Sequence, residues 1–248
     1  MEEVDVQVEP AERDAARSAS ELPFWERPET VAWFAARPPD ARVVSLFAER
    51  PRAARVLDLG CAAGRNADWL ASAGFDVWAL DASSAMVAHT RARLARHLGE
   101  EAAASRVRRG DMADLGAFAD GSLDAVIAIG ILPGARSWGA WRRAVAEVAR
   151  VLVPGGELIL THFTPETGPD GPPLEAVPGE PHLYRRVFDE RPALLLRRPE
   201  LDAHLADHAL EPLVETVEVP ATTMDGHRTT LNGHFRKRPA AVPPKESR

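Results

Sequence analysis

Between residues 55 and 163, short apolar runs alternate with longer stretches whose apolar residues recur at helical spacing. The apolar runs of strand length cover residues 56–59, 75–80, 123–130 and 157–163, and a further short strand is expected over residues 106–109. The helical stretches between them cover residues 64–73, 84–104 and 138–152. This alternation predicts parallel strands joined by helical crossovers, so we expect an α/β fold with a doubly wound sheet.

The flanking segments extend this core at both ends. Residues 30–36 and 41–49 have helical patterns, which predicts an N-terminal helical cap over residues 21–50. Near the C-terminus we expect a helix over residues 199–209 and strands over residues 213–219 and 228–236. With a hairpin-type turn at Asp225 and Gly226, the last strand is antiparallel and completes a sheet of seven strands.

Three segments are predicted to lie outside the regular core. Residues 1–20 are highly charged and are expected to form a mobile acidic arm, and residues 240–248 a tail. Residues 164–193 leave the end of a strand and begin with a Pro- and Gly-rich loop longer than most connections, so we interpret them as a lid-like insertion. Residues 21–239 then form a single domain, which fits a chain of 248 residues.

Charge and composition exclude several functional classes. Residues 1–30 hold nine acids and three arginines, so most of the net charge of −7 lies there and the remainder is nearly neutral. Without a basic stripe, the chain is poorly suited to binding nucleic acid. We expect no membrane partner and a cytoplasmic location, because no apolar run is long enough to span a bilayer and the N-terminus is acidic. With Cys61 as the one cysteine, we expect no disulfide framework and no metal site.

Residues 55–66, R-V-L-D-L-G-C-A-A-G-R-N, contain the clearest candidate for a binding turn. An apolar strand that carries Asp58 ends at Gly60, and a helix begins near Gly64. Glycines allow close approach of the backbone to a ligand, and the start of a helix offers free N–H groups. The G-x-G-x-x-G spacing of dinucleotide sites is absent, because Ala62 and Arg65 occupy its third and sixth positions.

The pattern that is present, D-x-G-x-A-x-G, resembles motif I of the class I S-adenosylmethionine-dependent methyltransferases. Further landmarks follow in that family's order: Asp81 after the second strand, Gly110-Asp111-Met112 after the third, Gly130 after the fourth, and L-V-P-G-G-E-L before the fifth. The turn G-C-A-A-G-R-N and the C-terminal D-G-H-R-T-T-L-N-G-H-F-R-K-R-P resemble tellurite-resistance-type and other small-molecule methyltransferases. The resemblance implies a Rossmann-like fold and S-adenosylmethionine as cofactor.

The same resemblance implies a cofactor site along the strand ends. Asp81 would accept both ribose hydroxyls, Asp58 would reach the ammonium of the methionine part, and Asp111 would accept from the adenine amino group. Asp111 could instead cap a turn, and Ala62 departs from the glycine usual in the family. The other residues expected to contact the cofactor are Gly60, Cys61, Ala62, Gly64, Asn66, Ala82, Met112, Ile129 and Gly130.

Methyl transfer from a sulfonium requires in-line approach of a nucleophile more than acid or base chemistry. If a base is needed, the candidates are His162, at the end of the fifth strand, and His234, on the last strand. Each also has a structural alternative. Candidates for the substrate pocket come from the cap and from the end of the insertion, namely Trp25, Trp33, Tyr184 and Arg185.

The sequence therefore predicts methyl transfer from S-adenosylmethionine to a small-molecule nucleophile. The 28 arginines against two lysines indicate a GC-rich, bacterial genome. Nucleic-acid methylation is excluded, since G-I-L-P-G follows the fourth strand where amino-methylating DNA enzymes have Asp or Asn before Pro-Pro-aromatic. Two alternatives stay open: a natural-product O- or N-methyltransferase, and a non-catalytic cofactor-binding protein that acts as a scaffold or regulator.

Overall fold

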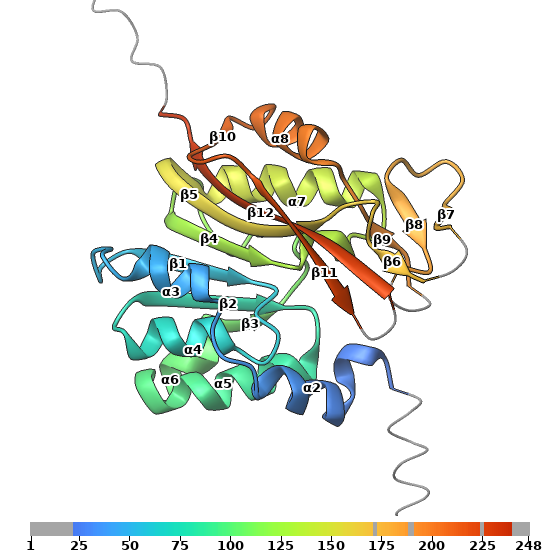
Figure 1. Ribbon diagram of the computed structural model, residues 1–248. Coiled ribbons are helices and arrows are strands. Elements are labelled where there is room, and N and C mark those ends of the chain that lie inside the picture. Colours follow the sequence, from blue (N-terminus) through green and yellow to red (C-terminus); the bar gives the residue numbers. More distant parts are fainter. Residues whose placement is uncertain (1–21, 171–172, 188–190, 224–225, 240–248) are drawn as a thin grey trace, which may run out of the picture.

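The computed structural model describes residues 22–170, 173–187, 191–223 and 226–239 (Figure 1). The helical elements are η1 (Phe24–Glu26), α2 (Pro28–Ala35), α3 (Ala41–Phe47), α4 (Arg65–Ser72), α5 (Ser84–Leu98), α6 (Glu100–Arg106), η2 (Leu132–Gly134), α7 (Trp138–Val151) and α8 (Arg198–Ala206). The main sheet contains β1 (Arg55–Leu59), β2 (Asp76–Asp81), β3 (Val107–Arg109), β4 (Leu123–Ile129), β5 (Leu152–Phe163), β6 (Gly168–Pro169), β10 (Leu210–Pro212), β11 (Val217–Thr223) and β12 (Gly226–Lys237). A second, small sheet contains β7 (Glu175–Ala176), β8 (Leu183–Arg185) and β9 (Ala193–Leu194).

The main sheet confirms the predicted fold class. Over the described residues its order is β10-β12-β5-β4-β1-β2-β3, and β6 and β11 also pair with β12. Strands β1 to β5 pair in parallel, and β12 is antiparallel to β5. The chain runs outward from β1 to β3 and then returns to β4, so the carboxyl ends of β1 and β4 form the switch point where ligands bind in doubly wound sheets.

Helices cover both faces of the sheet (Figure 1). Neighbouring residues of β1 point to opposite faces, as the pleat of a strand requires. Leu57 belongs to the core beneath α7, together with Trp141. Val56 belongs to the core beneath α3 and α4, together with Phe47 and Leu70. Burial on both faces explains why these strands are continuous apolar runs in the sequence.

The carboxyl ends of the parallel strands, α2 and the small sheet all lie toward the right-hand side of Figure 1. Hydrogen bonds attach the N-terminal cap beside β2. Ser83 Oγ donates to the carbonyl oxygen of Trp25 at 2.8 Å. The Glu26 carboxylate accepts from the backbone N–H groups of Ser84 and Ala85 at the start of α5. The cap therefore borders the strand end that carries Asp81.

Two predicted elements were wrong in their extent. The helix expected over residues 84–104 is divided into α5 and α6 at Gly99, whose φ of +82° and ψ of 159° do not continue a helix. The strand expected over residues 213–219 is replaced by β10 and β11, which pair with different parts of β12. The segment between β10 and β11 contacts α8 through a hydrogen bond, in which Thr216 Oγ1 donates to the Asp202 carboxylate at 2.8 Å.

The insertion over residues 164–193 is more regular than its composition indicated. It contains β6, β7, β8 and the start of β9, and its apolar residues Leu183 and Ala193 are buried. Whether it acts as a lid stays a prediction. The predicted acidic arm, the tail and Asp225 of the predicted turn lie outside the described residues.

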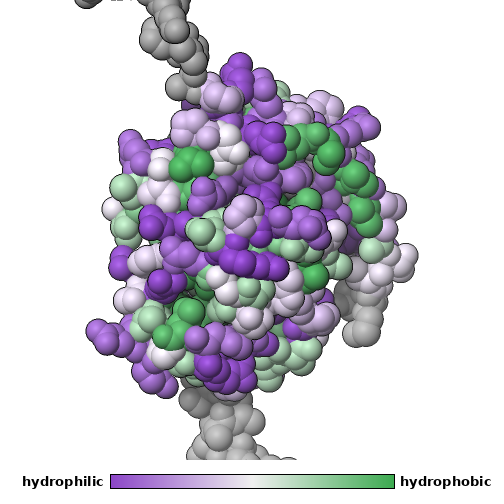
Figure 2. Space-filling model, turned by 90° about the vertical axis from the view of Figure 1, so that its left-hand side faces the viewer, coloured by the Kyte–Doolittle hydropathy of each residue, from purple (hydrophilic) through white to green (hydrophobic). Residues whose placement is uncertain are grey.

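On the face seen in Figure 2, the left-hand side of Figure 1, hydrophobic areas are small and separated by hydrophilic residues. None of the helices in the described ranges is both long and apolar enough to cross a membrane. Large exposed apolar side chains of the described residues lie in the cap and around β11: Leu22, Phe24, Trp25, Trp33, Val214, Val217 and Val219.

Candidate cofactor and substrate site

The turn between β1 and α4 has a shape that requires glycine. Gly60 and Gly64 have φ angles of +72° and +78°. A Cβ on Gly60 would lie 2.6 Å from the Ile131 side chain, and a Cβ on Gly64 would lie 2.8 Å from that of Thr90. The N–H of Gly60 also donates to the Leu80 carbonyl oxygen at 2.8 Å. Backbone conformation and close packing on both sides therefore fix the turn against β2.

Asp81, at the end of β2, directs its carboxylate toward this turn. Oδ2 accepts from the N–H of Ala62 and Oδ1 from the N–H of Ser83, each at 2.9 Å. Burial raises the pKa of Asp81, and these N–H donors oppose that rise. Ala62 has a φ of +46°, a left-handed conformation that is unfavourable for residues other than glycine. The departure from glycine thus places a strained residue in contact with Asp81.

Asp58 lies in β1, directly below the turn. Its side chain is buried, and Oδ2 accepts from the N–H of Ala67 in the first turn of α4 at 3.1 Å. Burial raises the pKa of Asp58 to about 7, although the Ala67 N–H and the charge of Arg65 act in the opposite direction. Near neutral pH, Asp58 therefore exchanges between acid and carboxylate, and a cationic ligand group would favour the carboxylate.

Other predicted cofactor residues lie along the same edge but already have contacts within the protein. Asp111 is exposed, and its Oδ1 accepts from the N–H of Ala113 at 2.8 Å, so it caps the turn after β3. Asn66 Oδ1 accepts from the N–H of Asp40 at 2.9 Å and thereby connects α4 to the start of α3. Their cofactor roles stay predictions. The remaining positions lie at the ends of β2, β3 and β4 or within three residues after them: Ala82, Met112, Ile129 and Gly130.

Cys61 is buried within the turn, where its Sγ lies 3.8 Å from Thr90 Oγ1. Burial raises the pKa of the thiol well above its usual value, and the charges of Asp58 and Asp81 add to the effect. The thiol is therefore protonated and packs as a small apolar group. In the described part of the chain, no cluster of His, Cys, Asp or Glu side chains is arranged to hold a metal ion.

The first candidate base, His162, is fully buried beneath α7. The Trp141 indole N–H donates to Nε2 at 3.1 Å, and because an indole nitrogen is only a donor, Nε2 carries the lone pair of the ring. Burial lowers the pKa of His162 to about 4, so the ring is neutral at physiological pH. These are the contacts of a structural histidine, with its basic nitrogen already occupied. The catalytic role stays a prediction without support from this geometry.

The second candidate base, His234, is directed away from the carboxyl ends of the strands. Its Nε2 lies 2.6 Å from Oε2 of Glu157, in the first half of β5. Arg50 and Arg236 also pair with this carboxylate. Burial favours a higher pKa for Glu157, but these cationic partners and His234 hold it below its usual value. The structure therefore places His234 in an ion-pair cluster and not beside Asp81.

The predicted substrate residues lie in two groups. The Trp25 and Trp33 rings both contact Phe34, with centroid distances of 5.0 and 4.7 Å, so they form one aromatic cluster in the cap. Both side chains are exposed. Tyr184 and Arg185 lie on β8 in the small sheet, where Tyr184 is partly buried and Arg185 is exposed. The cap precedes the parallel strands in the sequence and the small sheet follows them, and both lie toward the carboxyl ends of those strands (Figure 1).

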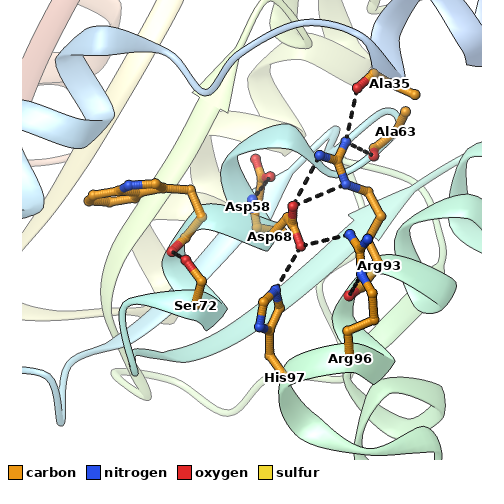
Figure 3. A network of polar contacts seen from close by, with 10 residues as sticks. Ala35, Asp58, Ala63, Asp68, Ser72, Arg93, Arg96 and His97 are labelled. Atoms are coloured by element: carbon orange, nitrogen blue, oxygen red, sulfur yellow. Dashed lines mark hydrogen bonds and ion pairs between the residues drawn. The ribbon is translucent and has the colours of Figure 1, made fainter.

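The sequence did not single out Arg93, which connects the turn to the cap (Figure 3). Its Nη1 donates to the carbonyl oxygens of Ala63, in the turn, and Ala35, at the end of α2, each at 3.2 Å. Its guanidinium also pairs with Asp68 of α4 at 3.0 Å. The second oxygen of Asp68 is contacted by Arg96 and His97. No local signal distinguishes Arg93 from the other arginines, because its role depends on three distant segments.

The chain is similar to known proteins in sequence over part of its length and in fold. Residues 56–156 match the family described as methyltransferase domain. No curated protein matches the chain. The structure of 1,6-didemethyltoxoflavin-N1-methyltransferase from Burkholderia thailandensis, with bound 1,6-didemethyltoxoflavin and S-adenosylhomocysteine, is similar with a TM-score of 0.61 and 23% identity. That similarity covers 95% of this chain and 93% of the other.

Two further solved structures extend the comparison. A SAM-dependent methyltransferase from Methanosarcina mazei has a TM-score of 0.58 at 20% identity, covering 78% of this chain and 97% of the other. A TehB-like SAM-dependent methyltransferase from Corynebacterium glutamicum has a TM-score of 0.51 at 17% identity, covering 92% and 96%. Residues 56–156 are therefore similar to a methyltransferase domain, and the chain has the fold of the class I S-adenosylmethionine-dependent methyltransferases.

Proposed function

We propose that this protein transfers the methyl group of S-adenosylmethionine to a small-molecule nucleophile at the carboxyl edge of its sheet. The similarity of residues 56–156 to a methyltransferase domain supports this class of reaction. The observation that carries the placement of the site is the Asp81 carboxylate, which the N–H groups of Ala62 and Ser83 orient beside the glycine turn. Each carboxylate oxygen has a further lone pair, so the pair of oxygens suits a vicinal diol such as that of ribose.

We place the three parts of the cofactor along this edge in the order of the strands. Strands β1, β2 and β3 are neighbours, with Leu59 opposite Leu80 and Asp81 opposite Arg109. In this arrangement the glycine turn and Asp58 would border the methionine part, and Asp81 would bind the ribose hydroxyls. Asp111 and Met112 would contact the adenine from the end of β3, and Ile129 and Gly130 would approach from β4.

The bound cofactor would supply a methyl group on a positively charged sulfur. Asp58, Asp81 and the glycine turn would hold the cofactor, and its methyl group would pass to a lone pair of the substrate, with S-adenosylhomocysteine as the product. Any proton that the nucleophile carries would be lost to bulk solvent, before the substrate binds or after the product leaves. The contribution of the protein is to hold the reactants in line and to exclude water, for which Trp25 and Trp33 of the cap and Tyr184 of the small sheet are candidates.

A small-molecule acceptor is supported by the similarity to 1,6-didemethyltoxoflavin-N1-methyltransferase, which holds 1,6-didemethyltoxoflavin in its structure. The alternatives are a natural-product O- or N-methyltransferase and a non-catalytic scaffold. Release of S-adenosylhomocysteine across a panel of oxygen, nitrogen, sulfur and chalcogen nucleophiles separates them. Turnover identifies the acceptor atom, whereas cofactor binding without turnover on the panel favours the scaffold.

The single buried cysteine and the Arg-rich composition support a bacterial cytoplasmic location.

Affinity for S-adenosylhomocysteine is expected to fall as the pH decreases below 7. Because the pKa of Asp58 is about 7 in the free protein, the side chain binds a proton below that pH. The ammonium of the ligand favours the carboxylate, so binding releases that proton and affinity falls by up to about tenfold per pH unit. Calorimetric titration at pH 6 and pH 8, in two buffers of different ionisation enthalpy, measures both affinity and proton release.

Asp58→Asn is the control for this prediction, because it removes the titrating group from the same position. In that variant, proton release should disappear and the affinities at the two pH values should converge. Equal affinity of the unmodified protein at both pH values, with no proton released, would show that Asp58 does not face the ammonium.

A further inference from the structure

Three arginines from separate segments lie at the carboxyl edge of the sheet, where the charges of two of them act on the third. Arg37 follows α2, Arg65 begins α4 directly after the glycine turn, and Arg228 lies on β12. Nη1 of Arg65 donates to the carbonyl oxygen of Pro38 at 3.1 Å, next to Arg37 in the chain. The charges of both Arg65 and Arg228 act on Arg37. The cap, the turn and the last strand thus each contribute one cation to the same region.

Two of these guanidinium groups lie over the faces of aromatic rings. Cζ of Arg37 lies 3.6 Å from the centroid of the Trp33 ring, and Cζ of Arg228 lies 5.8 Å from that of Phe163. A guanidinium stacked on a ring keeps the N–H groups at its edge available to an oxyanion. Phe163 is the last residue of β5. This strand is the parallel neighbour of β4, whose carboxyl end borders the switch point. Arg228 is therefore positioned near the strand ends where a methyl acceptor must approach the cofactor.

The partners of these arginines contrast with those of three arginines elsewhere in the chain. Arg50, Arg93 and Arg150 each pair with a carboxylate. Among the described residues, no ion pair joins Arg37, Arg65 or Arg228 to an acidic side chain. Partial burial and the charges of Arg65 and Arg228 lower the pKa of Arg37, yet a guanidinium remains charged in proteins. The cluster therefore contains mutual repulsion, which a bound anion would relieve.

We propose that Arg37, Arg65 and Arg228 bind an oxyanion of the methyl-accepting substrate, such as a carboxylate or a phosphate. This inference rests on the proposed function, because it places the substrate beside the cofactor site. The Trp33 and Phe163 rings would pack against the apolar part of the same molecule. The cluster supplies the anion contact at a different place from Arg185, which is exposed on the small sheet.

The test uses protein saturated with S-adenosylhomocysteine and two pairs of probes. Benzoate is compared with benzamide, and phenyl phosphate with benzyl alcohol, by calorimetric titration. At least one anion should bind about tenfold more tightly than its neutral counterpart. Arg37→Gln, Arg65→Gln and Arg228→Gln should each weaken that binding roughly tenfold, which corresponds to about 1.4 kcal/mol. Arg143→Gln removes the same charge from the exposed surface of α7 and should leave binding unchanged.

The same titrations separate this inference from the proposed function. If S-adenosylhomocysteine does not bind the unmodified protein, the proposed function is contradicted. If it binds but neither anion is preferred over its neutral counterpart, the anion site alone is overturned. Equal weakening by Arg143→Gln and by the three cluster variants would also overturn it, because the effect would then depend on net charge and not on position.

Discussion

Replacing Asp81 with alanine is expected to weaken the binding of S-adenosylhomocysteine by at least about 100-fold. The carboxylate would accept two hydrogen bonds from the ribose, and a hydrogen bond to a charged group contributes roughly 1.5–3 kcal/mol. Two such bonds correspond to a loss of about 3 kcal/mol or more, and each 1.4 kcal/mol is a factor of ten in affinity. Isothermal titration calorimetry measures the dissociation constants, and circular dichroism verifies that the variant is folded.

The matched control is Asp76→Ala, at the opposite end of the same strand. Asp76 pairs with Arg55 and Arg106, away from the carboxyl edge, so its loss affects stability but not the cofactor site. Asp81→Asn is a second control, since it keeps an acceptor for the Ala62 or Ser83 N–H and separates folding from the charge of the carboxylate. If Asp81→Ala retains affinity within about threefold of the unmodified protein, the ribose assignment is incorrect.

Gly60→Ala is expected to reduce the free energy of unfolding by roughly 2–5 kcal/mol and to impair cofactor binding. The left-handed φ of +72° contributes about 1–2 kcal/mol of this cost. The clash of the new Cβ, 2.6 Å from the Ile131 side chain, contributes about 1–3 kcal/mol more. Urea denaturation measures the stability, and titration with S-adenosylhomocysteine measures the binding.

Gly74→Ala provides the comparison, because Gly74 also has a positive φ, of +87°, but a Cβ added there would meet no other part of the described chain within 4 Å. It lies after α4, away from the turn, so we expect about 1–2 kcal/mol of destabilisation with unchanged affinity. Equal effects of the two substitutions on both stability and affinity would mean that close packing of the turn against Ile131 is unimportant.

The parallel core was predictable because its signals are local. Continuous apolar runs mark β1, β4 and β5, which are covered on both faces, and glycines mark the turns that follow β1 and β4. The resemblance to methyltransferase motifs placed Asp58 and Asp81 at strand ends, where the structure has them. The family match over residues 56–156 covers this locally encoded part of the chain.

The later elements depend on contacts between distant residues, which single-sequence patterns do not contain. The division between β10 and β11 follows from pairing with different parts of β12 and from the contact of Thr216 with Asp202. The small sheet requires pairing across the insertion, whose Pro- and Gly-rich composition indicated only a loop. The break at Gly99 could have been predicted, since glycine is unfavourable within a helix.

Prediction was weakest for the substrate side of the site. Residue type and position on a strand indicate His162 and His234 as bases, but Trp141 donates a hydrogen bond to the first and Glu157 pairs with the second. Both contacts come from packing between elements. For the same reason the sequence does not predict the arginine cluster, because its members are far apart in the sequence and lie in one region only in the folded chain.

A crystal structure of the protein with S-adenosylhomocysteine tests the central claim most directly. The proposed site predicts that both ribose hydroxyl oxygens lie within about 3 Å of the Asp81 carboxylate oxygens, with the amino acid part of the ligand over the glycine turn. A ligand located instead in the groove of about 450 Å³ between α2 and α5, lined by Val31, Ala85 and His89, would contradict it.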